Sequence, residues 1–140
     1  MTILGIGVDL VHVPRITSIL TRNHGDRFAA RILSNEELSE WQSLGLVSIS
    51  HRARFLAVRW SVKESTYKAM YPITRPSWKE VSYHGLSAQR QKPFVSYHPF
   101  RSENKEKIGS IHVSVSHDGD YVYSSVCIEA PMNLCRHTSP

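Results

Sequence analysis

The segment 55–69, FLAVRWSVKESTYKA, constrains the fold more than any other part of the chain, because its apolar residues recur with the period of a helix. At about 100° per residue, two apolar faces flank a narrow polar strip. That strip contains Ala57, Ser61, Glu64 and Lys68. Glu64 and Lys68 form either an ordinary salt bridge along the helix or a pair of partly desolvated charges that a ligand can meet. We predict a helix over residues 51–70, ended by Tyr71-Pro72.

Two stretches have the alternating pattern of strands. Residues 3–11 alternate large apolar side chains with small or polar ones, and Gly5, Gly7 and Asp9 share one face. Asp9 is therefore expected to project from a face with little side-chain bulk. Near the end of the chain, alternation on both sides of residues 117–120 predicts a hairpin with an Asp-Gly turn.

The remaining elements are shorter. Ser34 and Glu37 have the spacing of a capping box, which predicts the start of a helix. The other expected elements are a helix that begins at Pro14, an interruption at 23–25, a helix at 27–33, strands near 80–83 and 94–97, and a charged surface turn at 102–107. We therefore predict one α+β domain over residues 1–130 and a loose tail over residues 131–140.

The composition limits the partners. The 140 residues include 17 Lys and Arg against 12 Asp and Glu, with an isoelectric point near 9.4, so an anionic partner is plausible. No stretch is long and apolar enough to predict a transmembrane helix, and a strand that begins at residue 3 leaves no expected room for a leader peptide. Cys127 and Cys135 lack the spacing of a metal or redox motif, which fits a reducing compartment.

Four collinear blocks over residues 3–128 resemble the 4′-phosphopantetheinyl transferases, in particular the holo-acyl-carrier-protein synthase branch. The helix matches the pattern W-x-x-K-E-[AS]-x-x-K-A. The matching residues are Trp60, Lys63, Glu64, Ser65, Lys68 and Ala69. The other three blocks are GIGVDLVHVPRI (5–16), RFAARILSNEEL (27–38) and HVSVSHDGDY (112–121).

This resemblance implies a bent antiparallel sheet packed on a long helix, and transfer of the phosphopantetheine arm of coenzyme A to a serine of an apo acyl carrier protein. It implies a Mg²⁺ ion held by Asp9 and Glu64, since magnesium is commonly bound by one or two carboxylates and substrate phosphates. Glu64 is also the candidate base, acting directly or through a water, and Lys68 the candidate phosphate contact. The implied coenzyme A contacts are Arg59, Lys68, His117 and Asp118, with Lys68 and His117 also expected in the catalytic set beside Glu64.

The resemblance also implies an acidic acyl carrier protein as partner. Arg15 and Arg22 occupy the block that meets it, and Arg31 is a further candidate; a solvated helix face is the alternative for Arg22 and Arg31. Short relatives form homotrimers with sites between subunits, so a homotrimer is expected. Arg54 and Lys63 are either phosphate contacts or solvated side chains.

One segment departs from the bacterial pattern. Residues 70–80, MYPITRPSWKE, replace a glycine-rich turn and look like the fungal mitochondrial members, which favours the mitochondrial matrix over the bacterial cytoplasm. Two other functions compete with the transferase: a basic α+β nucleic-acid-binding module and a catalytically silent structural relative. The first leaves Asp9 and Glu64 unexplained and lacks a recognisable binding motif.

Overall fold

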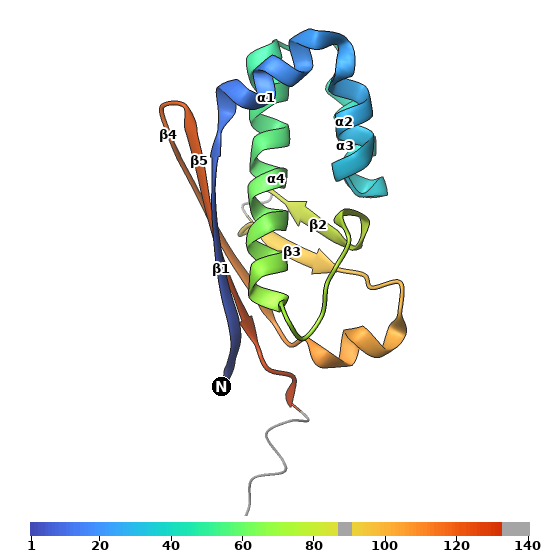
Figure 1. The fold of residues 1–140 in the computed structure, drawn as a ribbon, viewed down its shortest axis with the longest axis vertical. Coiled ribbons are helices and arrows are strands. Elements are labelled where there is room, and N and C mark those ends of the chain that lie inside the picture. Colours follow the sequence, from blue (N-terminus) through green and yellow to red (C-terminus); the bar gives the residue numbers. More distant parts are fainter. Residues whose placement is uncertain (87–90, 133–140) are drawn as a thin grey trace, which may run out of the picture.

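A computed structural model describes residues 1–86 and 91–132, and the long helix α4 (Ile49–Met70) runs through its centre (Figure 1). Ser48 caps its start by accepting a hydrogen bond from the amide of His51 at 3.3 Å. At its end the chain turns into extended backbone at Tyr71, before Pro72. The helix is two residues longer at its start than the sequence predicts, because a serine cap lies outside the apolar repeat.

The strands form two antiparallel sheets. The larger has the order β1-β5-β4, from β1 (Ile3–His12), β4 (Ile111–Asp118) and β5 (Tyr121–Glu129). The smaller pairs β2 (Val81–His84) with β3 (Phe94–Tyr97). Figure 1 shows α4 with the larger sheet on one side and the smaller sheet on the other. The α+β class and the antiparallel packing on a long helix are confirmed, although the strands make two hydrogen-bonded sheets instead of one bent sheet.

Before α4 the chain is helical almost throughout. The elements are α1 (Val13–Ile19), a π-helical turn η1 (Leu20–His24), α2 (Gly25–Ile32) and α3 (Asn35–Ser43). The predicted interruption at residues 23–25 falls at His24, whose φ and ψ angles of −110° and 5° separate η1 from α2, whereas Gly25 itself has helical angles of −60° and −45°. A Cβ atom there would lie 2.7 Å from the Leu20 side chain, so glycine is present for close packing and does not break the helix.

Two local predictions hold and one shifts. The capping box before α3 is present, with the Ser34 amide donating to Glu37 Oε2 at 2.9 Å and the Glu37 amide donating to Ser34 Oγ at 3.3 Å. The hairpin turns at Gly119, where φ is +53°. Strand β4 extends to Asp118, so His117 and Asp118 belong to the strand and not to the turn. The charged segment 102–107 is a short 3-10 helix, η3 (Ser102–Lys107), and another, η2 (Trp78–Glu80), precedes β2.

The packing of β1 on α4 is unusually close. A Cβ atom on Gly5 would lie 2.0 Å from the Ala69 carbonyl oxygen, and one on Gly7 would lie 1.9 Å from that of Ser65. Three buried hydroxyls join the same helix to β5: Ser124 Oγ lies 2.7 Å from Ser61 Oγ and 2.5 Å from Ser65 Oγ. The glycine face of β1 predicted from the sequence is therefore the face that receives the helix.

The opposite face of β1 is apolar and uncovered in the single chain. Ile6, Val8 and Leu10 point away from α4 and are 61%, 46% and 59% exposed. Their strand neighbours on β5 are Cys127, Ser125 and Tyr123. This outer apolar stripe, Ile6, Val8 and Leu10, is far more exposed than the apolar side chains on the helix-facing side.

Some predictions fall on residues outside the described part. Most of the expected tail, residues 133–140 with Cys135, lies there. Within the described ranges no helix is long and apolar enough to span a membrane.

Candidate active site

Asp9 and Glu64 are brought together where β1 crosses α4. Asp9 is carried by β1, and its backbone carbonyl accepts a hydrogen bond from Ser61 Oγ at 3.3 Å. Its side chain is only 15% exposed. Glu64 lies half-buried on the facing side of α4, three residues beyond Ser61. The strand and the helix thus place two acids from distant parts of the sequence at one point.

Lys68 completes this group, but it pairs with Asp9 and not with Glu64. Its ammonium lies 3.1 Å from Asp9 Oδ1 and donates to the Val8 carbonyl at 2.9 Å. The sequence spacing allowed a salt bridge between Glu64 and Lys68 along α4, but Lys68 instead forms one with Asp9 on β1. Two of the three ammonium protons are therefore used, which leaves one for a ligand.

The surroundings of Glu64 shift its pKa. Burial raises the pKa of Glu64 above its ordinary value, the negative charge of Asp9 raises it further, and Lys68 opposes both effects. The carboxylate form of Glu64 is therefore a stronger base than an exposed glutamate. An added cation at this point would favour the ionised form of Glu64.

The residues present fit a magnesium ion. Asp9 Oδ2 is buried and has no hydrogen-bond partner, so one carboxylate oxygen is left for another ligand. In the described ranges there is no cluster of three or more His, Cys, Asp or Glu side chains suited to a metal. A pair of carboxylates still suits magnesium, which keeps waters and takes further oxygens from substrate phosphates.

Two cavities meet at Glu64. The first, about 330 Å³, lies between α1 and α4, and Asp9, Glu64 and Arg15 contribute its charged side chains. Its apolar walls include Phe28 and Trp60, whose rings stack with centroids 5.4 Å apart. The second, about 200 Å³, lies on the other side of Glu64 between α4 and the segment before β2.

The predicted carrier-protein contacts lie beside the first cavity. Arg15 and Arg22 are both exposed and line one shallow hollow along α1 with Pro14 and Ser18. Arg15 lines the Asp9 and Glu64 cavity as well, whereas Arg22 does not. Arg31 borders a smaller hollow next to Trp60 and Trp78.

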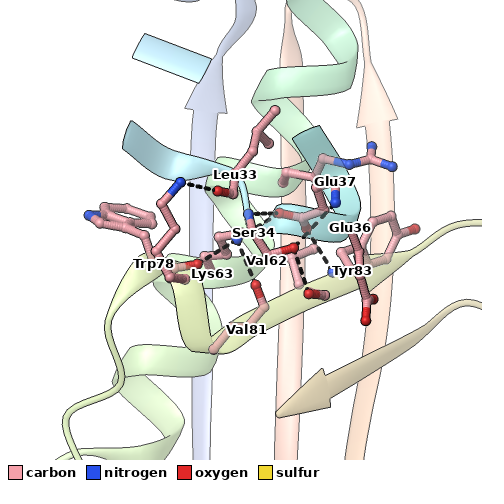
Figure 2. Close-up of polar contacts among 12 residues, drawn as sticks. Leu33, Ser34, Glu36, Glu37, Val62, Lys63, Trp78, Val81 and Tyr83 are labelled. Carbon is pink, nitrogen blue, oxygen red and sulfur yellow. Dashed lines mark hydrogen bonds and ion pairs between the residues drawn. The ribbon is translucent and has the colours of Figure 1, made fainter. Parts of the chain in front are cut away.

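Lys63 is neither a solvated side chain nor an available phosphate contact, which corrects both predictions for it. Its side chain is 2% exposed, and its ammonium lies 2.7 Å from Glu37 Oε2 (Figure 2). It also donates to the carbonyls of Trp78 at 2.7 Å and Val81 at 2.6 Å. Burial lowers the pKa of Lys63, and the charge of Glu37 opposes this effect. Arg54, the other residue with the same two alternatives, is exposed.

Arg59 is not brought to Asp9 and Glu64 within one chain. It is buried on another side of α4, where its guanidinium lies 2.8 Å from Glu40 Oε2 and 3.4 Å from the centre of the Phe55 ring. Burial lowers the pKa of Arg59, while Glu37 and Glu40 oppose this. A contact between Arg59 and a nucleotide bound at its own chain's Glu64 would require a large rearrangement.

His117 and Asp118 also lie apart from the carboxylate pair. His117 pairs with Val122, which pairs with Val11, so His117 lies on the same face of the sheet as Asp9 but two strands across and two residues along, about 12 Å at ordinary strand spacing. Both residues are exposed at the end of β4. The structure thus joins Asp9, Glu64, Lys68 and Arg15, and leaves Arg59, His117 and Asp118 at other places on the surface.

The second cavity was not predicted from the sequence. Its wall is formed by Pro76, Ser77 and Trp78, in the segment that departs from the bacterial pattern. Nothing in the periodicity of residues 71–80 predicts which side chains face α4, because loops follow no repeat.

Comparison with known proteins identifies the family of this chain. The sequence model of the 4′-phosphopantetheinyl transferase superfamily matches residues 5–126. The holo-[acyl-carrier-protein] synthase of Erwinia tasmaniensis is 32% identical over 132 residues, which are 93% of this chain and all of the relative. That of Streptococcus pyogenes serotype M1 is 34% identical over 128 residues, covering 91% and 97% of the two chains.

Solved structures give the same result. The holo-[acyl-carrier-protein] synthase from Neisseria meningitidis superposes with a TM-score of 0.73 at 32% identity, covering 91% of this chain and 99% of that one. The Bacillus anthracis enzyme, solved in complex with CoA (3′,5′-ADP), gives a TM-score of 0.70 at 26% identity, covering 93% and 99%. The fold and these matches define a phosphopantetheinyl transferase. The chain belongs to the holo-acyl-carrier-protein synthase family of that superfamily.

Proposed function

We propose that this protein transfers the 4′-phosphopantetheine arm of coenzyme A to a serine hydroxyl of an apo acyl carrier protein. The observation that carries the proposal is the convergence of Asp9, Glu64 and Lys68, with one buried oxygen of Asp9 left unpartnered. The family match and the coenzyme A complex of the Bacillus anthracis relative support coenzyme A as the donor.

The residues divide the reaction between them. Glu64, whose pKa is raised by burial, accepts the serine proton directly or through a water. The serine oxygen bonds to the phosphorus that bears the arm, and the bond from that phosphorus to the leaving 3′,5′-ADP breaks. The third N–H group of Lys68 donates a hydrogen bond to phosphate oxygens. Mg²⁺ held by Asp9 and Glu64 would supply neutralisation of the pyrophosphate charge.

The carrier protein is proposed to approach along α1. Arg15 lines both the exposed hollow and the cavity that contains Glu64, so a partner bound there places its serine near the base. The net charge of +5 favours an acidic partner. Arg22 extends the same basic surface away from the acids.

We propose a homotrimer with sites shared between subunits. The outer apolar stripe of β1 is suited to burial against another copy. Sharing would also explain why Arg59 and His117, expected near coenzyme A, lie away from Glu64 in one chain. Light scattering should give three times the chain mass, and Val8→Glu, which places a charge in the stripe, should reduce it. A monomeric wild-type protein would refute this assembly.

The compartment is proposed from residues 71–80, which resemble the fungal mitochondrial members and favour the mitochondrial matrix. The bacterial relatives fit the bacterial cytoplasm as the alternative. Imaging of the tagged full-length protein in its own cells distinguishes the two.

One experiment tests the function. Purified protein is incubated with apo acyl carrier protein and coenzyme A labelled in its pantetheine arm, with and without Mg²⁺. Label should enter the carrier protein only with Mg²⁺, and not when its acceptor serine is replaced by alanine. If none of several acyl carrier proteins is labelled, the protein is better explained as a catalytically silent structural relative. If it also binds nucleic acid tightly, a nucleic-acid-binding module is the better explanation.

A further inference from the structure

A further hollow lies where the chain leaves α4, between residues 72–75 and the start of η3 (Figure 1). Its volume is about 430 Å³, and because Arg75 and Arg101 are among its eight lining residues we call it the basic hollow. Five of the eight belong to residues 70–80, the segment that departs from the bacterial pattern. The proposed reaction does not explain why this segment carries such a surface.

The basic hollow is separate from the two cavities at Glu64, because no residue lines both it and either of them. Residues 76–78 line the second cavity, whereas residues 72–75 and Glu80 line the basic hollow. A ligand in the basic hollow would therefore contact the same segment without entering the proposed active site.

A buried carboxylate joins the two walls of the hollow. Glu80 is 7% exposed, and its two oxygens accept hydrogen bonds from the amides of Ser77 at 2.6 Å and Phe100 at 2.9 Å. The first amide lies just after the wall formed by residues 72–75, and the second belongs to the opposite wall. The hollow is therefore a built feature of the fold, because charge-assisted hydrogen bonds of one side chain fix both walls.

Two guanidinium groups give the hollow its positive charge. Arg75 and Arg101 line it together with one carboxylate, that of Glu80. Both arginines are exposed, and within residues 1–86 and 91–132 neither forms an ion pair. The Arg75 guanidinium lies 5.2 Å from the centre of the Tyr71 ring, a cation–π contact that restricts its position. Both cations are therefore available to an anion.

A phosphate or diphosphate group fits these donors, because a guanidinium can bind two phosphate oxygens at once. Asn104 adds a donor to the lining: its Oδ1 accepts a hydrogen bond from Lys107 at 3.0 Å, so its amide hydrogens remain. Phe100 lines the same hollow and is 75% exposed, so its ring can stack on a base attached to the phosphate. We propose that the basic hollow binds a phosphate or diphosphate group, either free or as part of a nucleotide.

Isothermal titration tests this binding in EDTA, so that no divalent cation links the ligand to the two acids of the active site. Inorganic pyrophosphate and ADP are titrated separately, and one molecule of each is expected to bind per chain. Arg75→Gln and Arg101→Gln should each weaken binding about tenfold or more, since each removes charge-assisted hydrogen bonds. Two controls should stay within about twofold of the wild type. Lys105→Gln removes an exposed charge of η3 that does not line the hollow, and Lys68→Ala removes the ammonium of the active site.

A second measurement locates the ligand without any variant. In the wild-type protein, the amide resonances of residues 73–75 and 101–104 should shift when pyrophosphate is added. ADP that binds more tightly than pyrophosphate, with the difference lost in Phe100→Ala, would support the proposal and identify a nucleotide as the source. Equal affinities would support it and identify the free diphosphate.

Three results would overturn the proposal. One is a wild-type protein that binds neither ligand, and another is a loss in Lys105→Gln as large as in the two arginine variants, which would show attraction by net charge alone. The third is binding that requires Lys68 and not the arginines, which would place the anion at the active site. Transfer to the carrier protein is not measured here, so this site and the proposed function can fail separately.

Discussion

Gly7→Ala tests whether the close contact of β1 with α4 sets the distance between the two acids. A Cβ atom at this position would lie 1.9 Å from the Ser65 carbonyl oxygen, and ordinary van der Waals contact begins near 3.4 Å. The obstacle is backbone and cannot rotate away, so the strand and the helix must separate by about 1.5 Å. Asp9 lies two residues beyond Gly7, and Glu64 directly precedes Ser65, so the same movement widens the site.

Two effects of opposite sign act on stability. Replacing glycine by alanine reduces the freedom of the unfolded chain, which stabilises by about 0.4–1 kcal/mol. Overpacking costs about 1–3 kcal/mol or more, so the free energy of unfolding should fall. A displacement of about 1 Å in a catalytic group can cost about a hundredfold in rate, so transfer should fall by roughly that factor even in the folded variant.

The assay separates these effects. Urea unfolding gives the loss of stability, and transfer is then measured at a temperature where the variant is almost entirely folded. Gly85→Ala is the matched control, since its nearest neighbour would lie at 3.8 Å. Wild-type stability and rate in Gly7→Ala would refute the close packing. Lost stability with a normal rate would show that the contact does not set the spacing of the acids.

The other predictions concern single groups of the site. Asp9→Ala and Glu64→Ala should each abolish most transfer and retain the circular dichroism of the fold; near-normal turnover by either at saturating Mg²⁺ would remove that residue from the site. Lys68→Ala should weaken coenzyme A binding, measured by titration, and lower the turnover number, measured by rate assay. Lys68→Arg should restore little, because a planar guanidinium cannot replace a compact ammonium between Asp9 Oδ1 and a backbone carbonyl. Unchanged affinity and rate in Lys68→Ala would show that Lys68 is only a structural partner of Asp9. Reversing Arg15 and Arg22 to Glu should raise the Michaelis constant for the carrier protein and leave the Michaelis constant for coenzyme A nearly unchanged, and the rise should be smaller at high salt. As a single substitution, the change at Arg15 should have the stronger effect, because Arg15 also lines the cavity of the two acids. The opposite pattern would show that the carrier protein binds elsewhere.

The periodic parts of the fold were predictable, and the loops were not. Helix α4, strand β1 and the capping box at Ser34 follow from spacing alone, because their patterns depend on local geometry. The break in the helix lies at His24, and Gly25, which suggested it, has helical angles and makes room for the Leu20 side chain. The π-helical turn has no sequence pattern of its own.

For the site, the sequence predicted the identity of the important residues better than the direction in which their side chains point. Lys63 and Lys68 lie five residues apart on α4, yet one is buried in a fully paired network and the other reaches Asp9 at the surface. The difference is set by partners distant in sequence, Glu37 and β1, which helical spacing cannot reveal. The separation of Arg59 and His117 from Glu64 in one chain was equally invisible, since it depends on the order of the strands.

The buried hydroxyls of Ser61, Ser65 and Ser124 have a consequence for alternative packings of the same chain. Apolar contacts alone would tolerate sliding α4 along the sheet by one helical turn, because similar side chains recur at that interval. Such a slip would leave one of the two helix serines facing Ser124 and move the other into an apolar interface, and an unpaired buried hydroxyl costs about 1–3 kcal/mol. Three small polar groups therefore select a single register, and that register is the one that places Glu64 beside Asp9.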